Sequence, residues 1–149
     1  MEFGEALVVG NPSPMPIYKG QRLKSLPLCV EEAQYVAGVF GSEPLIGPEA
    51  SAEAVMGALE DAQVIHMATH GLLDAGNTTA KQYLQGGIAL ASQNENGKDG
   101  ILSATEIADT RITAKLVVLS CCDTARGRIA VPPSISINKK TLNLFNPWL

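Results

Sequence analysis

Two short apolar runs of this chain end in residues that could carry out nucleophilic catalysis. Residues 64–69 are followed by His70, and residues 116–120 are followed by Cys121 and Cys122. A cysteine attacks a carbonyl as the thiolate, and a nearby imidazole can supply both the proton transfer and a favourable charge. A histidine at the end of one run and a cysteine at the end of another therefore indicate a thiol peptidase.

The elements that carry these residues are predicted to be strands of one sheet. A short apolar run closed by turn residues is typical of a buried parallel strand. In an open α/β sheet, the residues just past the carboxyl ends of such strands line the reaction crevice. The remaining pattern predicts strands over 5–10, 44–47 and 87–91 and helices over 29–40, 50–62 and 102–109. Between these elements it predicts a polar connection up to residue 27, irregular structure over 71–85 and a turn over 94–100. The alternation of strands and helices indicates an α/β fold with a mainly parallel sheet covered on both faces.

Length and composition fit one globular domain. The chain has 149 residues, 46% of them hydrophobic and 17% charged, with a formal net charge of −4. This charge argues against a nucleic-acid-binding protein, which needs a concentrated basic face, and no apolar run approaches the ~20 residues of a membrane helix. Three cysteines do not make a disulfide framework, and the N-terminus lacks the basic start of a signal peptide. We therefore expect reduced thiols in a cytoplasmic protein. We also expect no cofactor.

Other motifs fit structural roles better than chemical ones. His66 and His70 have the spacing of a helical zinc site, but in a strand they would lie roughly 13 Å apart, too far for one ion. His66 is therefore expected to be a hydrogen-bonded core histidine or to support the site. Residues 8–12 follow the first strand without the glycine and lysine pattern of a phosphate-binding loop. Glu31 and Glu32 are expected at a helix start, where the dipole favours acidic side chains.

The two candidate motifs belong to a series of six segments that together resemble the CHAT domain. The segments cover residues 6–12, 26–33, 45–50, 65–71, 99–107 and 116–124, and they include Ala-Thr-His-Gly at 68–71 and Leu-Ser-Cys-Cys-Asp-Thr at 119–124. CHAT is a caspase-like module that is commonly found downstream of tetratricopeptide repeats and is related to separase, gingipain and caspase peptidases. The resemblance implies a caspase-like three-layer sandwich with a mainly parallel sheet.

The resemblance also implies a role for each site residue. His70 falls at the catalytic histidine and Cys122 at the nucleophile, while Cys121 replaces the alanine usually found before it and is the alternative. Gly71 falls where such peptidases draw a backbone N–H for the oxyanion. Asp123 is a candidate for binding a basic P1 side chain, or else a solvated turn residue. The implied activity is cleavage of a protein or peptide substrate through a Cys-His dyad, with no metal.

The resemblance stops shortly after the cysteines. The family's Thr-Gly and Gly-Glu-Gly pattern is absent from residues 124–129, and Pro132 and Pro133 fall where a helix should begin. The 15 acidic residues all lie at or before position 123, and the 26 residues that follow contain none. We therefore expect a partial CHAT domain over residues 1–130 that lacks its C-terminal strands, and a divergent tail over 131–149 that could be disordered. Three functions compete: a peptidase, a protein-interaction module whose open sheet edge pairs with another chain, and an inactive fragment.

Overall fold

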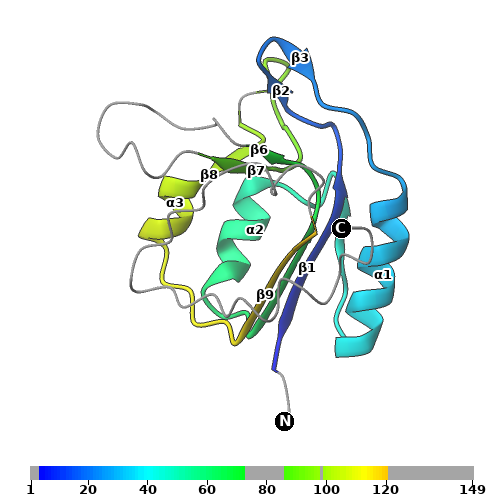
Figure 1. The fold of residues 1–149 in the computed structure, drawn as a ribbon, viewed down its shortest axis with the longest axis vertical. Helices are drawn as coiled ribbons and strands as arrows, with labels where there is room; N and C mark the ends of the chain where they lie inside the picture. The colour runs from blue at the N-terminus through cyan, green and yellow to red at the C-terminus, as the bar shows by residue number, and fades with distance from the viewer. Residues whose placement is uncertain (1–3, 73–85, 98, 121–149) are drawn as a thin grey trace, which may run out of the picture.

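The computed structural model describes residues 4–72, 86–97 and 99–120. Its centre is a four-stranded sheet with the order β4–β1–β5–β9, in which every neighbouring pair is parallel (Figure 1). The strands are β1 (Ala6–Pro12), β4 (Leu45–Gly47), β5 (Val64–Ala68) and β9 (Leu116–Ser120). Each was expected from its apolar run, and the crossover connections between them allow the parallel arrangement.

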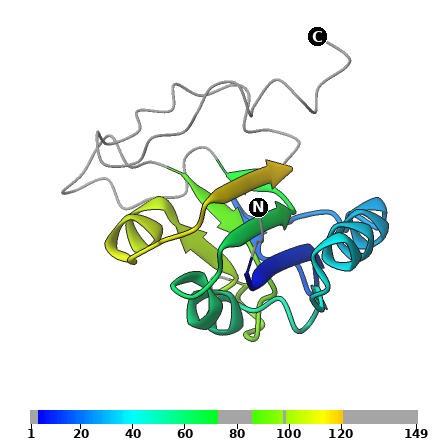
Figure 2. The ribbon, with the colours of Figure 1, turned by 90° about the horizontal axis from the view of Figure 1, so that it is seen from below.

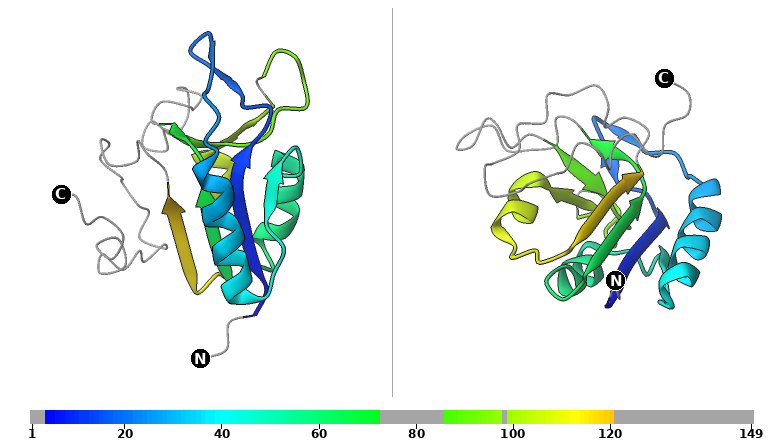
Figure 3. Two further views of the ribbon diagram at one scale, coloured as in Figure 1. Left: turned by 90° about the vertical axis from the view of Figure 1, so that its right-hand side faces the viewer. Right: turned by 60° about the horizontal axis from the view of Figure 1, so that its bottom comes forward.

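Helices cover both faces of this sheet (Figures 2 and 3). They are α1 (Leu28–Phe40) and α2 (Ala52–Leu59). On one face, Ala33 and Ala37 of α1 pack onto β1 and β5. On the other face, Val55 and Leu59 of α2 join a larger core with the same two strands. The expected α/β fold, a mainly parallel sheet between two layers, is confirmed. Among the described residues, no helix combines the length and the apolar character needed to cross a bilayer.

A second, antiparallel sheet lies on the α2 side, and the sequence pattern predicted only part of it. Its strands are β6 (Gly71–Leu72), β7 (Gly87–Ala89) and β8 (Ile101–Ser103), in that order, and α3 (Ala104–Asp109) follows β8. The expectation of a helix from residue 102 is therefore wrong at its start. Leu102 pairs with Ile88 and is buried, whereas Ser103 forms a capping box with Glu106 and begins the helix one residue later.

The connection between β1 and α1 holds a small hairpin that the sequence pattern did not predict. The hairpin consists of β2 (Ile17–Tyr18) and β3 (Gln21–Arg22). Its turn residues, Lys19 and Gly20, have φ values of 50° and 80°, the left-handed geometry that a two-residue hairpin turn requires. Glycine adopts this geometry without cost. Figure 1 shows the hairpin beyond the carboxyl ends of the central strands.

Strand β9 is less buried than its apolar run predicted. Val117 and Leu119 are 49% and 44% exposed. Within the part of the chain that the structure describes, β9 pairs with β5 alone and forms one edge of the sheet. The pattern of residues 116–120 indicated a strand correctly, but burial depends on what lies beside the strand.

Candidate functional site

His70 lies directly after β5, at the carboxyl edge of the central sheet. The buried Thr69 donates its hydroxyl to the Ala89 carbonyl at 2.8 Å, and the Ala89 N–H donates to the His70 carbonyl at 3.0 Å. Both bonds tie the end of β5 to β7. The backbone that carries His70 is therefore fixed, while its side chain stays partly exposed. Gly71 is the first residue of β6, and its use as an oxyanion donor stays a prediction.

The imidazole of His70 has a partner that the sequence did not reveal. Its Nε2 lies 2.7 Å from the backbone carbonyl oxygen of Lys24, 46 residues earlier in the chain. A carbonyl oxygen can only accept, so Nε2 carries a proton and donates it. In the neutral ring, Nδ1 is then the nitrogen that can accept a proton. Every residue has a backbone carbonyl, so no residue type could have pointed to this one.

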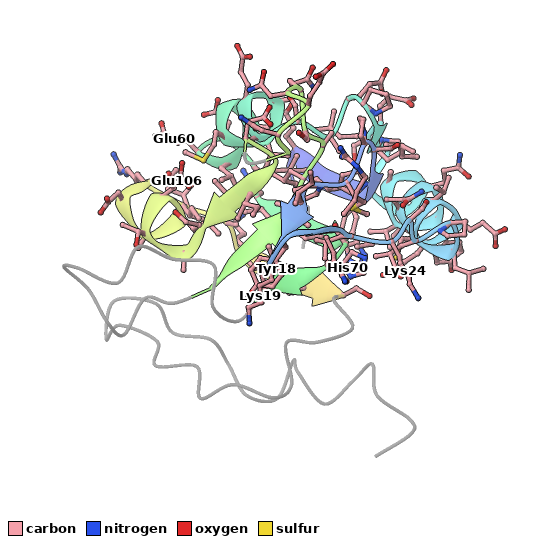
Figure 4. The ribbon with its side chains drawn as sticks, turned by 90° about the horizontal axis from the view of Figure 1, so that it is seen from above. Tyr18, Lys19, Lys24, Glu60, His70 and Glu106 are labelled. Carbon is pink, nitrogen blue, oxygen red and sulfur yellow. The ribbon has the colours of Figure 1, made fainter. Side chains whose placement is uncertain are left out.

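The segment whose backbone contacts His70 carries basic side chains. Figure 4 shows His70 between Lys24 and the hairpin residues Tyr18 and Lys19. The Lys19 Nζ lies 5.3 Å from the centroid of the Tyr18 ring, a cation–π contact that keeps the ammonium beside the ring. Residues 6–30 include three basic side chains and no acidic one. This setting favours an anion near His70, either a cysteine thiolate or a substrate carboxylate.

His66 has a structural environment distinct from that of His70. It is 7% exposed, and its Nε2 lies 2.8 Å from Oε1 of Glu32 on α1. The parallel register places His66 level with Val8 and Val118, on the sheet face that α1 covers. The expectation of a hydrogen-bonded core histidine is confirmed, and Glu32 is its partner. Within the described residues, no group of three or more His, Cys, Asp or Glu side chains could hold a metal ion.

The candidate nucleophile and its neighbours, Cys121, Cys122 and Asp123, lie outside the described residues. Strand β9 ends at Ser120, the last described residue, which lies opposite Ala68 of β5 in the parallel register. In sequence, Cys122 follows Ser120 by the same two positions by which His70 follows Ala68. Adjacent strands lie about 4.8 Å apart. The two strands therefore end level with each other just before the two candidate residues, and the roles of those residues stay predictions.

Comparisons with known proteins agree with the resemblance seen in the sequence. The family profile described as the CHAT domain matches residues 2–137. The chain is similar to tetratricopeptide repeat protein 28 of Mus musculus, with 28% identity over 164 aligned residues, and of Homo sapiens, with 24% identity over 164. Both alignments cover 92% of this chain and 7% of the relative, so the chain spans a small part of the relatives it matches. No solved structure matches this chain. Because the family profile matches most of its length, the chain belongs to the CHAT domain family.

Proposed function

We propose that this chain is a caspase-like cysteine endopeptidase domain that cleaves protein substrates through His70 and Cys122. The observation that carries the proposal is the hydrogen bond between His70 Nε2 and the Lys24 carbonyl oxygen at 2.7 Å. This bond holds the ring at the sheet edge and leaves Nδ1 to exchange a proton with a thiol. The basic residues of the segment that contacts His70 support the same role, since positive charge stabilises a thiolate.

The proposed reaction needs one proton acceptor and one nucleophile. His70 Nδ1 takes the proton of the Cys122 thiol, and the thiolate sulfur forms a bond to the substrate carbonyl carbon. The carbonyl oxygen becomes an oxyanion, for which the Gly71 N–H is the proposed donor. The tetrahedral intermediate expels the amine, which receives the proton from Nδ1, and a thioester remains. Water, deprotonated by Nδ1, then attacks the thioester and releases the acid and the Cys122 thiol.

The proposed partners follow from the family and from the names of the relatives. Both curated relatives are named as tetratricopeptide repeat proteins, and the chain covers 7% of each. We propose that tetratricopeptide repeats associate with this domain and that its substrate is a protein or peptide. Asp123 remains a candidate for binding a basic P1 side chain. The cytoplasm, where thiols stay reduced, suits a thiolate enzyme.

A non-catalytic interaction module is the second candidate, and strand β9 supports it, because among the described strands it pairs with β5 alone. Val117 and Leu119 of β9 are 49% and 44% exposed. An exposed edge with apolar side chains can pair with a strand from another chain. This function would require neither His70 nor Cys122.

Labelling with an electrophilic peptide separates the two candidates. The probe is a set of peptide acyloxymethyl ketones, read out by intact mass. We expect one adduct on the wild type, none on Cys122→Ala, slow labelling of His70→Ala, and unchanged labelling of the matched control Cys29→Ala on α1.

Each alternative predicts a different labelling pattern. Labelling that persists in Cys122→Ala and disappears in Cys121→Ala would assign the nucleophile to Cys121. Labelling that survives in both variants would refute the dyad. A wild type that melts cooperatively and takes no label would favour the interaction module, and aggregation without a cooperative transition would indicate an inactive fragment.

A further inference from the structure

Asn11 makes side-chain contacts that a simple turn residue does not need. It lies near the end of β1 with a φ of 42°, a left-handed conformation that asparagine and aspartate tolerate better than other non-glycine residues. Its Oδ1 accepts hydrogen bonds from the Leu26 N–H at 2.7 Å and from the Ser25 hydroxyl at 3.1 Å. Asn11 thus holds a loop that is 15 residues away in sequence.

The loop that Asn11 holds is the one that presents the Lys24 carbonyl to His70. Ser25 directly follows Lys24, so the two donors to Asn11 lie one and two residues beyond the carbonyl that receives the His70 Nε2–H. Lys24 and Ser25 are exposed, which leaves this stretch little packing to fix its peptide planes. Before it, the Leu23 N–H donates to the Pro16 carbonyl at 3.0 Å.

The strand that carries Asn11 is well fixed. In the register between β1 and β5, Gly10 lies opposite Ala68. Ala68 precedes His70 by two residues. A Cβ at Gly10 would lie 2.4 Å from the Ala33 Cβ and 2.5 Å from the Cys29 carbonyl oxygen, so α1 packs directly onto the backbone there. Because the backbone next to Asn11 is fixed in this way, the Asn11 side chain can hold the loop at a defined position relative to the sheet.

We propose that Asn11 is a positioning residue for His70, acting through the Ser25 and Leu26 donors and the Lys24 carbonyl. The proposal rests on the proposed function in one respect, that His70 exchanges protons through Nδ1. When Asn11 fixes the loop, the Lys24 carbonyl selects the Nε2–H tautomer. Without that selection, a fraction of neutral rings carries the proton on Nδ1, where it blocks uptake of the thiol proton.

Two substitutions at one position separate the hydrogen bonds from the backbone geometry. Asn11→Gly accepts the positive φ but removes the acceptor, and Asn11→Asp accepts the same φ and keeps an acceptor oxygen in place. The chain contains 2 histidines, so a protein labelled with ¹⁵N-histidine gives two sets of ring signals, which His66→Gln assigns.

We expect the wild type and Asn11→Asp to show His70 as the Nε2–H tautomer and Asn11→Gly to show a mixture. The rate of labelling by the peptide electrophile should fall in Asn11→Gly in proportion to the fraction of rings that lose the Nε2–H tautomer, about twofold for an even mixture. Recovery of both readouts in Asn11→Asp supports positioning through the acceptor. An unchanged tautomer in a folded Asn11→Gly protein overturns the proposal.

A second variant covers the case in which Asn11→Gly does not fold. Ser25→Ala removes one of the two donors without touching β1 and should shift the tautomer in the same direction by a smaller amount. No shift there would count against the proposal. The tautomer measurement needs no activity, so a wild type that takes no label would defeat the proposed function while leaving the role of Asn11 to be decided by the NMR signals.

Discussion

Removing the Glu32 carboxylate should destabilise the domain because it leaves a buried imidazole donor without its acceptor. His66 is 7% exposed, and its Nε2 lies 2.8 Å from Glu32 Oε1. A buried donor left unsatisfied costs about 1–3 kcal/mol. In a domain of this size, each 1 kcal/mol lowers Tm by about 2–4 °C, so Glu32→Ala should lower Tm by about 2–12 °C.

The neighbouring glutamate provides a matched control. Glu31 is exposed and lies in the first turn of the same helix, so Glu31→Ala makes the same change in charge and in helix propensity. Removing the Glu31 carboxylate should lower the free energy of unfolding by no more than its interaction with the helix dipole, about 0.3–1 kcal/mol. Thermal and urea unfolding followed by circular dichroism measure both variants.

A double-mutant cycle isolates the pair itself. Combining Glu32→Ala with His66→Phe should give a smaller loss of stability than the sum of the two single losses, because the two residues share one contact. Equal Tm values for Glu32→Ala and Glu31→Ala would refute the idea that the Glu32–His66 bond fastens α1 to the sheet.

Other predictions concern packing, pH dependence and the sheet edge. Gly10→Ala should lower stability by about 1–3 kcal/mol, because the new Cβ would lie 2.4 Å from the Ala33 methyl group of α1. Gly38→Ala should raise stability by up to about 1 kcal/mol, because alanine favours a helix more than glycine does and its Cβ would have nothing within 4 Å. Thermal melts of both variants check this pair, and equal effects would contradict it. The pKa of Asp99 is lowered, chiefly by the hydrogen bond from the Ser92 hydroxyl; desolvation, the next largest effect, opposes the shift, and the backbone N–H groups of Gln93 and Asn94 lower the pKa further. Its stabilising contribution is therefore present above the ordinary aspartate pKa and lost as pH falls through the lower folded value, so the Tm advantage over Asp99→Asn should shrink as pH falls below 3.8; an advantage independent of pH would disprove this. Finally, Leu119→Lys should reduce self-association in sedimentation velocity if β9 pairs with another chain, because a lysine on an edge strand opposes pairing; unchanged association would exclude this edge as the contact.

The elements that carry the candidate site were predictable because local patterns encode them. The apolar runs of β1, β5 and β9 and the helical spacing in α1 and α2 follow from the periodicity of each segment alone. The position of His70 at a strand end and the membership in the CHAT family also follow from short motifs. Burial of β9 did not follow, because Val117 and Leu119 depend on neighbours outside their own segment.

The sequence by itself determined which residue types stand at the strand ends, and the tertiary structure decided what each of them contacts. The Lys24 carbonyl lies 46 residues from His70, and Glu32 lies 34 residues from His66. The two histidines meet these partners because α1 and the loop before it pack against the sheet. The hydrophobic periodicity of a segment predicts its own secondary structure but not such a long-range contact. Every residue type has a backbone carbonyl, so the sequence could not single out the Lys24 carbonyl. Only the tertiary structure, which brings this loop against the end of β5, shows that it contacts His70.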